Sequence, residues 1–190
     1  MARMSRVESQ AQTRSQLIAT AKQMFFTDGY HPTSLEKVAE AAGYSKGAVY
    51  SNFRNKDELC AAVLDEIRAE RFTEVIALVS HSDRFEALRD WAQGVIGDPG
   101  WTTLEAEFAL HARPNEQLRS ELAGRLENLI ETLAAGVESA DDLDLAMSTR
   151  QAATVLLALS IGLGLMRSIN PAISVDGLVD TLRLMAGEPL

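Results

Sequence analysis

Cysteine and proline are scarce in this chain of 190 residues, which has one cysteine, Cys60, and five prolines. A single cysteine forms no internal disulfide, so nothing in the sequence requires an oxidising compartment. Few prolines leave room for long helices, because proline breaks a helix interior. The stretch 1–10 is polar and lacks the apolar segment of a signal peptide. We therefore expect a cytoplasmic protein.

Long apolar runs are lacking as well. The longest uncharged run lies between Arg150 and Arg167 and holds 16 residues, fewer than the roughly 18 that a membrane span requires. We therefore expect a buried helix here and no membrane partner.

Basic charge is scarce overall but unevenly distributed. The net charge is −9; residues 1–56 carry 8 Lys and Arg against 4 Asp and Glu, and residues 57–190 carry 10 against 23. The balance is thus +4 in the N-terminal part and −13 in the rest. Such a chain would meet a polyanion with its N-terminal part alone. A chance excess is the alternative, so charge by itself does not establish nucleic-acid binding.

Enzyme signatures are absent from the sequence. It has no nucleophile elbow, no phosphate-binding Walker loop, no zinc-protease motif and no dinucleotide fingerprint. The three histidines are widely spaced and lack cysteine partners, so we expect neither a metal nor a cofactor. Glu107 and His111 are one helical turn apart and could form an acid–base pair, but a polar pair at a pocket wall or surface is the simpler interpretation.

What the sequence does contain is helical periodicity along its whole length, with no convincing strand and no internal repeat. The pattern predicts an all-α fold of about nine helices. Beyond residue 55 these helices cover 56–79, 85–96, 101–111, 118–137, 147–168 and 174–185, with loops at 81–83 and 141–144. We expect two domains, residues 1–55 and residues 56–190.

The N-terminal third predicts an arm and three helices. The polar stretch to Gln12 is typical of a flexible arm, and an apolar stripe from Leu17 to Phe25 predicts the first helix. Thr33 is expected to cap a short helix over 34–42, with Glu36 completing a capping box. After Gly43, Ser45 caps a second short helix over 46–53. Two short helices joined by a tight turn form a helix-turn-helix.

The second short helix carries small or polar residues and is anchored inward by Val49 and Phe53. Small residues allow a backbone to approach DNA closely, and polar side chains can donate to bases or phosphates. The Tyr50 hydroxyl can reach a phosphate, and Lys56 begins the next helix, whose N-terminus also favours phosphate. A surface helix of no function is the alternative.

This segment resembles the tetracycline-repressor (TetR) family of bacterial transcription regulators. The resemblance is carried, at the family's spacings, by Thr33, Val38-Ala39, Ala42-Gly43, Ser45-Lys46-Gly47, Tyr50, Phe53 and Lys56-Asp57-Glu58-Leu59. The close match covers roughly residues 13–64. Beyond it only length and helical character agree.

The resemblance implies a DNA-binding surface that recognises double-stranded DNA at a pseudo-palindromic operator. Its expected residues are Thr33, Ser34, Ser45, Lys46, Gly47, Ala48, Tyr50, Ser51, Asn52 and Lys56. Two residues weaken the match, because Ala48 stands where many members have threonine and Glu36 cannot attract a phosphate. The base preference is therefore not readable.

The helix over 147–168 is apolar nearly all round, so we expect burial on every side and a second subunit as its cover. A central core helix in a monomer is the alternative. The resemblance implies a homodimer built from the last two long helices of each subunit as a four-helix bundle. The expected interface residues are Leu157, Ser160, Ile161, Gly164, Ser168, Leu178 and Leu182.

The resemblance also implies a small apolar or amphipathic effector, bound inside each subunit, that releases a repressor from DNA. Ligand pockets are mostly apolar with a few polar groups. The expected lining residues are Trp91, Trp101, Glu105, Phe108, His111 and Met166, with Glu107 and Arg113 as further polar groups. The competing hypothesis is a small helical enzyme or ligand carrier that merely contains a helix-turn-helix.

Overall fold

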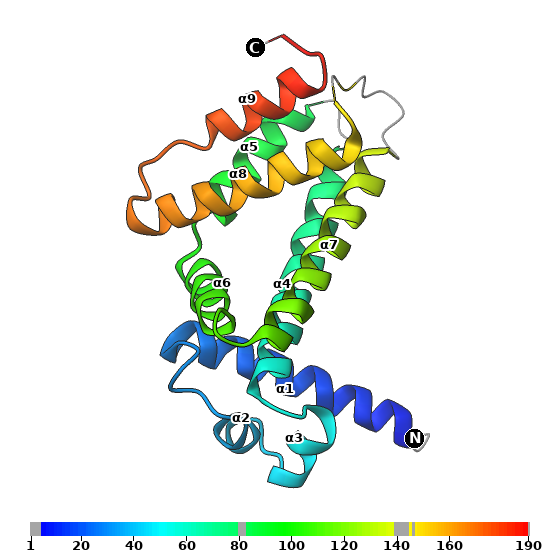
Figure 1. Ribbon diagram of the computed structural model, residues 1–190, viewed down its shortest axis with the longest axis vertical. Helices are drawn as coiled ribbons and strands as arrows, with labels where there is room; N and C mark the ends of the chain where they lie inside the picture. Colours follow the sequence, from blue (N-terminus) through cyan, green and yellow to red (C-terminus); the bar gives the residue numbers. More distant parts are fainter. Residues whose placement is uncertain (1–4, 80–82, 139–144, 146, 190) are drawn as a thin grey trace. The chain divides into compact units, whose positions relative to one another are not determined.

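The computed structural model describes residues 5–79, 83–138, 145 and 147–189. In this part of the chain there are nine α-helices and no strand (Figure 1), which confirms the predicted all-α fold. The helices are α1 (Arg6–Asp28), α2 (Leu35–Ala41), α3 (Lys46–Asn52), α4 (Lys56–Val79), α5 (Arg84–Val95), α6 (Pro99–Ala112), α7 (Glu116–Glu138), α8 (Thr149–Ile169) and α9 (Asp176–Met185). Residues 81–82 and the acidic stretch 141–144, both expected as loops, lie outside the described residues.

The predicted N-terminal arm is wrong from Arg6 onward, because that stretch is the start of α1. Ser5 caps the helix: its hydroxyl accepts from the Glu8 amide at 3.2 Å, and the Glu8 carboxylate accepts from the Ser5 amide at 2.7 Å. This reciprocal pair is a capping box. It lowers the pKa of Glu8, through the backbone amide first and the hydroxyl second.

The chain divides into two compact units. The first unit comprises Met1–Ile67 and Thr103–Asn115, and the second comprises Arg68–Thr102 and Glu116–Leu190. Helices α4 and α6 contribute residues to both. The units differ from the domains expected to meet at residue 55, because the first turns of α4 and the end of α6 pack with α1–α3.

The first unit has a dense apolar core. In it α1, α2 and α3 pack against one another. Its large side chains with less than 2 % of their surface exposed are Leu17, Tyr30, Val38, Val49, Phe53, Leu59, Val63, Ile67, Leu104 and Phe108. These residues come from all five helices of the unit, so the core fixes the helix-turn-helix on α1, α4 and the end of α6.

The second unit has two smaller apolar clusters. One joins α5 to α9 through Ala92, Ile96, Val175 and Leu178, with Trp91, Leu156 and Leu163 packed against it. The other joins α7 to α8 through Ile130, Ala134 and Ala153, with Leu133 and Leu157. The two helix pairs therefore share α8, which supplies residues to both clusters.

Arg167 of α8 lies beside the α5–α9 cluster and is almost fully buried. Its side chain is only 5 % exposed. The guanidinium donates to the carbonyl oxygens of Ile96 at 2.7 Å and Gln93 at 3.1 Å, and also to that of Ile173. A buried charge is tolerated when its hydrogen bonds are satisfied. Arg167 therefore holds the end of α5 and the α8–α9 connection to one point on α8.

The close approach at Arg167 requires a glycine at position 97. Gly97 has φ +94°, and a Cβ there would lie 2.4 Å from Cβ of Arg167. No side chain fits at that distance, and this positive φ is one that L-residues rarely adopt. Gly97 thus lets the α5–α6 turn touch α8.

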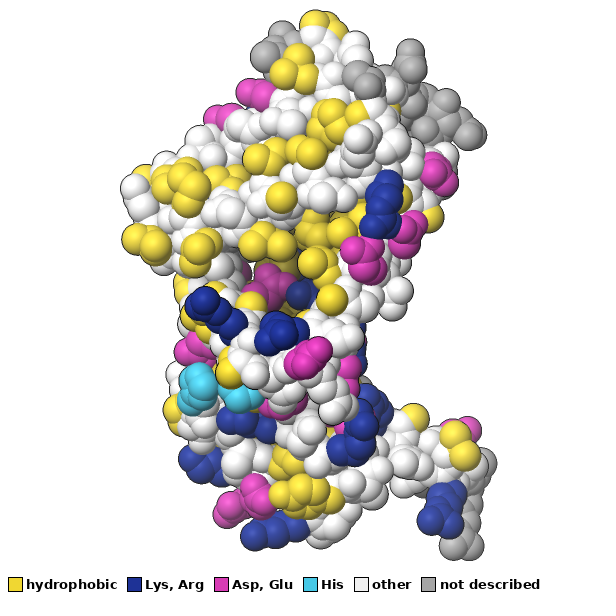
Figure 2. All heavy atoms as spheres, viewed as in Figure 1, with side chains coloured by type: hydrophobic (Ala, Val, Ile, Leu, Met, Phe, Trp, Pro, Cys, Tyr) yellow, Lys and Arg dark blue, Asp and Glu magenta, His cyan; other side chains and the backbone are white. Residues whose placement is uncertain are grey.

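The outward face of α8 is apolar and uncovered in the single chain, so the alternative of a central core helix in a monomer is wrong, and cover by a second subunit stays a prediction. The exposed large residues of α8 are Val155, Leu159, Ile161, Leu165, Met166 and Ile169, at 38–81 % of their surface. Figure 2 shows hydrophobic side chains gathered over this helix. By length and composition α8 also passes the test for a membrane span, which core helices of soluble proteins pass too.

Candidate nucleic-acid interface

The two helices of the helix-turn-helix begin at serine caps. The Ser34 hydroxyl accepts from the Lys37 amide at 3.3 Å, and the Ser45 hydroxyl accepts from the Ala48 amide at 3.2 Å. Gly43 lies between the helices with φ +74°, a conformation that suits glycine. The cap expected at Ser45 is confirmed. The capping box of Thr33 and Glu36 is wrong, because the cap of α2 is Ser34.

Thr33 faces the interior instead. It is 2 % exposed, and its hydroxyl donates to the Gly29 carbonyl oxygen at 2.9 Å. The hydroxyl's hydrogen is therefore used within the unit. This is evidence against the phosphate contact expected of Thr33, whereas the neighbouring Ser34 is half-buried.

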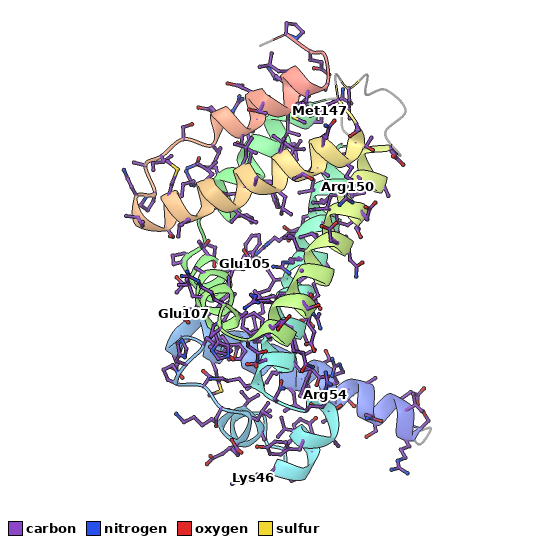
Figure 3. The ribbon with its side chains drawn as sticks, in the orientation of Figure 1. Lys46, Arg54, Glu105, Glu107, Met147 and Arg150 are labelled. Carbon is purple, nitrogen blue, oxygen red and sulfur yellow. The ribbon has the colours of Figure 1, made fainter. Side chains whose placement is uncertain are left out.

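Helix α3 presents the remaining expected residues on its surface. Val49 and Phe53 are buried beneath it, whereas Ser45, Lys46, Gly47, Tyr50 and Ser51 are exposed and Ala48 and Asn52 are half-buried. Figure 3 shows Lys46 at the tip of α3 in the first unit. The structure thus brings these residues together on one short helix.

Gly47 is not required by packing. A Cβ added there would meet only the Ser45 hydroxyl, at 3.8 Å. The missing side chain therefore leaves the backbone of α3 open to a close approach from outside the unit. This is the feature expected of a helix tip that enters a DNA groove.

The polar side chains of α3 hold the helix in the absence of DNA. The Ser51 hydroxyl and the Asn52 amide each donate to the Ala48 carbonyl oxygen at 2.8 Å. Arg14 of α1 closes the end of the helix, because it donates to the Asn52 carbonyl oxygen at 2.8 Å and lies 4.2 Å over the Phe53 ring. The helix that would enter the groove is thus held at both ends. Arg14 was not expected from the sequence, since its partners are 38 and 39 residues away.

Lys56 begins α4, as expected, but its side chain turns toward the α1–α2 connection. Its ammonium donates to the carbonyl oxygens of Tyr30 at 3.0 Å and His31 at 3.2 Å, and lies 4.1 Å over the Tyr30 ring. Partial burial lowers the pKa of Lys56, and Asp57 and Cys60 oppose this. A lysine has three N–H donors, so one stays available for a phosphate.

Tyr30 is the centre of a polar cluster that the sequence did not predict. Its ring is fully buried, and its hydroxyl donates to Asp57 of α4. Its backbone amide donates to the Glu107 carboxylate of α6 at 2.7 Å. Burial first, and the contact with Asp57 second, raise the pKa of the Tyr30 hydroxyl far above its ordinary value. The cluster therefore joins the α1–α2 turn, α4 and α6.

Glu107 and His111, the pair one helical turn apart, serve this cluster separately. Nε2 of His111 lies 3.3 Å from a carboxylate oxygen of Asp57, while Glu107 binds the Tyr30 amide. The His111 ring also stacks on Phe108, with centroids 6.4 Å apart, and both contact the Tyr30 ring. Among the described residues no three His, Cys, Asp or Glu side chains are arranged to hold a metal ion.

The residues expected to line an effector pocket fall in both units. Glu105, Phe108 and His111 lie in the first unit, where Phe108 and His111 pack against Tyr30. Trp91, Trp101 and Met166 lie in the second. There Trp91 packs on the α5–α9 cluster and donates to Glu74 at 2.8 Å, whereas Met166 is on the outward face of α8. The structure therefore does not gather these six residues in either unit.

Trp101 differs from the other five expected pocket residues in having a buried side-chain donor, Nε1, without a hydrogen-bond partner among the described residues. A buried unsatisfied N–H costs about 1–3 kcal/mol. A ligand acceptor would remove that cost.

The residues expected at a dimer interface also separate. Ile161 is exposed on the outward face of α8, but Gly164 and Leu178 are buried within the second unit and Leu157 packs against the α7–α8 cluster. A Cβ at Gly164 would lie 3.6 Å from the Thr102 hydroxyl. Ser160, Ser168 and Leu182 are half-buried. Gly164 and Leu178 therefore offer no surface to a second chain, whereas the six exposed residues of α8 do.

Comparison with known proteins gives a consistent family. Residues 17–63 match the family described as bacterial regulatory proteins, tetR family. The chain is similar to the HTH-type transcriptional regulator TtgR of Pseudomonas putida, with 42 % identity over 67 residues. These make up 35 % of this chain and 31 % of that regulator. The chain thus spans less than a third of this relative's length.

Two further similarities extend over most of the chain. The HTH-type transcriptional regulator UidR of Escherichia coli (strain K12) is 25 % identical over 171 residues, which cover 84 % of each protein. The solved structure of Salmonella enterica GusR superposes with a TM-score of 0.67 at 25 % identity, covering 92 % of this chain and 93 % of that one. The curated relatives named here are transcriptional regulators and not enzymes.

Proposed function

Because the chain belongs to the TetR family of bacterial transcriptional regulators, we propose that it binds a pseudo-palindromic DNA operator as a homodimer. The observation that carries the proposal is the surface of α3. Exposed Lys46, side-chain-free Gly47 and polar Ser51 stand on a helix whose Val49 and Phe53 are buried. The local charge of residues 1–56, +4 against −13 for the rest, supports contact through this part alone.

The experiment is selection of bound fragments from random duplex DNA by the purified protein. We expect a motif with two-fold symmetry, because a symmetric dimer places one recognition helix in each half-site. A selection that enriches no sequence above the input pool would overturn the proposal. The helical enzyme or carrier would then be the better explanation.

The homodimer is supported by the outward face of α8. Large exposed apolar patches on soluble proteins mark interaction sites, and this one runs along a helix of 21 residues. A second copy would cover it with an equivalent face. The expected dimer should be seen by sedimentation in the absence of DNA.

We further propose that a small apolar or amphipathic effector lifts repression by releasing the protein from DNA. The buried, unpartnered Nε1 of Trp101 supports a ligand with a hydrogen-bond acceptor. The effector must weaken DNA binding, and by linkage operator DNA must weaken effector binding by the same factor. The corresponding coupling free energy is typically about 1–3 kcal/mol.

A fluorescence titration tests this coupling, because Trp91 and Trp101 are the two tryptophans. Compounds that quench fluorescence should bind less tightly when operator DNA is present. A compound that binds equally well with and without the operator is not an inducer. If no compound class binds and Trp101→Ala leaves regulation in cells unchanged, the effector assignment is wrong.

A further inference from the structure

The structure leaves Glu36 without the capping role expected from its sequence position. The cap of α2 is Ser34, and the third residue of that helix is Lys37, so Glu36 takes no part in a capping box. A carboxylate in the first turn of a helix is favourable through the helix dipole, but that effect does not fix its direction. The main partner of its carboxylate lies on the neighbouring helix.

Glu36 accepts a hydrogen bond from Tyr50 of α3. The two oxygens, Oε1 of Glu36 and Oη of Tyr50, are 2.6 Å apart. The Tyr50 hydroxyl is the main cause of a lowered pKa at Glu36, followed by the backbone amide of Glu36 and the Ser34 hydroxyl, and Glu36 raises the pKa of Tyr50. Tyr50 is 50 % exposed. The pair therefore lies on the surface that the proposed function assigns to DNA.

This hydrogen bond restricts what Tyr50 can do. A tyrosine hydroxyl has one hydrogen to donate, and it is given to Glu36. A phosphate oxygen carries negative charge and only accepts. Tyr50 therefore cannot donate to a phosphate, the contact expected from the sequence, unless its bond to Glu36 is broken.

The pair instead presents acceptors, which are the lone pairs of the Glu36 carboxylate that remain beside its contacts with Tyr50, Ser34 and its own backbone amide, and those of the Tyr50 oxygen. In the major groove the donors are the amino groups of cytosine and adenine. The adenine amino group has the acceptor N7 beside it on the same base, which would repel a carboxylate. Cytosine offers its N4 amino group alone, and guanine and thymine offer only acceptors there.

We propose that Glu36, held in place by Tyr50, reads a cytosine in each half-site through the N4 amino group. The inference rests on the proposed DNA binding and deepens it. Glu36 is then a specificity-determining residue. Its negative charge weakens binding to any DNA, and a hydrogen bond from a cytosine amino group offsets this repulsion only at sites that have the cytosine. Tyr50 is its positioning residue.

The experiment compares Glu36→Gln with Glu40→Gln in the random-duplex selection and in titrations of the selected site. Both changes remove one negative charge from α2, and Glu40 is exposed. The wild-type motif should contain an invariant cytosine in each half. Glu36→Gln should reduce the preference for that cytosine about tenfold or shift it toward adenine, which glutamine binds. Glu40→Gln should leave the motif unchanged.

Tyr50→Phe supplies the second test and does not depend on the fold of the Glu36 variant. Without the hydroxyl the carboxylate is no longer held, so the cytosine preference should fall severalfold while the salt dependence stays the same. If Tyr50→Phe weakens binding to all DNA sequences equally and the preference for cytosine is unchanged, the hydroxyl contacts a phosphate and the inference is overturned.

Other outcomes separate this inference from the proposed function. A wild-type motif without an invariant cytosine, or a Glu36→Gln motif identical to that of wild type, overturns the role of Glu36 and leaves DNA binding standing. A wild-type protein that selects no motif overturns both.

Discussion

The two units satisfy their polar and apolar groups in different ways. In the first unit, Tyr30, Asp57, Lys56 and Glu107 find partners within the unit, and its apolar residues are concentrated in one core. The second unit buries a satisfied Arg167 but leaves six large apolar residues of α8 exposed. In the first unit the core is closed within one chain and the outer surface is mainly polar. In the second unit the apolar face of α8 stays exposed to solvent. Each therefore indicates its own kind of partner, a polyanion for the first and an apolar face for the second.

The largest expected effect concerns the polyanion. With about 6–10 phosphate contacts per dimer, affinity for DNA should fall about 10³–10⁵-fold between 50 and 200 mM salt. Lys56→Ala should lower the affinity for all DNA sequences alike, whereas Lys46→Ala or Asn52→Ala should also alter the base preference. Fluorescence anisotropy over a salt series measures both. A flat salt dependence would contradict the electrostatic assignment of the first unit.

The next effect concerns the uncovered face of the second unit. Ile161→Asp places a charge on the outward face of α8, 49 % exposed in the single chain. Full burial of such a side chain is worth about 1.5–3 kcal/mol and about half of it is still exposed, so a symmetric dimer, which counts the gain twice, should weaken by about 1.5–3 kcal/mol. Sedimentation equilibrium measures the loss.

Leu110→Asp is the matched control for Ile161→Asp. Leu110 is an apolar residue of the first unit with 67 % of its surface exposed, and its replacement should leave the dimer intact. A dimer that survives Ile161→Asp would mean that α8 is covered by something other than a second copy. Equal dissociation by both variants would remove the distinction between the units.

A smaller effect tests whether the interior of the second unit tolerates change. Gly97→Ala places a Cβ 2.4 Å from Cβ of Arg167 at a positive φ, so we expect a loss of about 2 kcal/mol or more of unfolding free energy. Gly94→Ala on α5 meets nothing within 4 Å and should stabilise by about 0.5–1 kcal/mol. Urea unfolding measures both. If the two variants have the same free energy of unfolding, the close contact with Arg167 does not require a glycine at position 97.

The smallest effect concerns the polar cluster around Tyr30 in the first unit. Tyr30→Phe leaves Asp57 without its hydroxyl donor and should cost about 1–3 kcal/mol. Tyr44→Phe removes an exposed hydrogen bond to Gln16 and should cost less than about 0.5 kcal/mol. Thermal unfolding followed by circular dichroism compares them.

The Tyr30→Phe variant should also differ from wild type in the pH dependence of its stability. The folded-state pKa of Tyr30 is raised above the ordinary value of 10.0, by burial first. The stability from this shift is fully present below about pH 10 and is lost as the pH rises above that value. Tyr30→Phe should therefore lose less stability than wild type between neutral pH and about pH 11.

Local features were predictable from the sequence, because they depend on neighbours along the chain. The cap at Ser45, the glycine turn and the apolar stripes follow from residues within one or two helical turns. The start of α1 was also readable, since Ser5 and Glu8 have the spacing of a capping box. The polar composition of that stretch led to the wrong prediction of an arm.

Features that depend on distant residues were not predictable. Thr33 and Ser34 are adjacent hydroxyls, and the one that turns inward, Thr33, donates to the Gly29 carbonyl oxygen four residues earlier. The Tyr30 cluster joins residues 27 and 77 positions apart, for which periodicity gives no signal. The apolar character of α8 was visible in the sequence. Which of its apolar residues are buried within one chain depends on how α5, α7 and α9 pack against it.

The hydrogen bonds of Arg167 also determine when the second unit can be finished during synthesis. They link residues 71 and 74 positions apart, and Arg84 pairs with Glu188 across 104 positions. The partners of Tyr30 described above are all available once His111 has been made. As the ribosome releases the chain from its N-terminus, domains fold in that order. The helices proposed to contact DNA can therefore be in place before Glu188, the partner of Arg84, has been made.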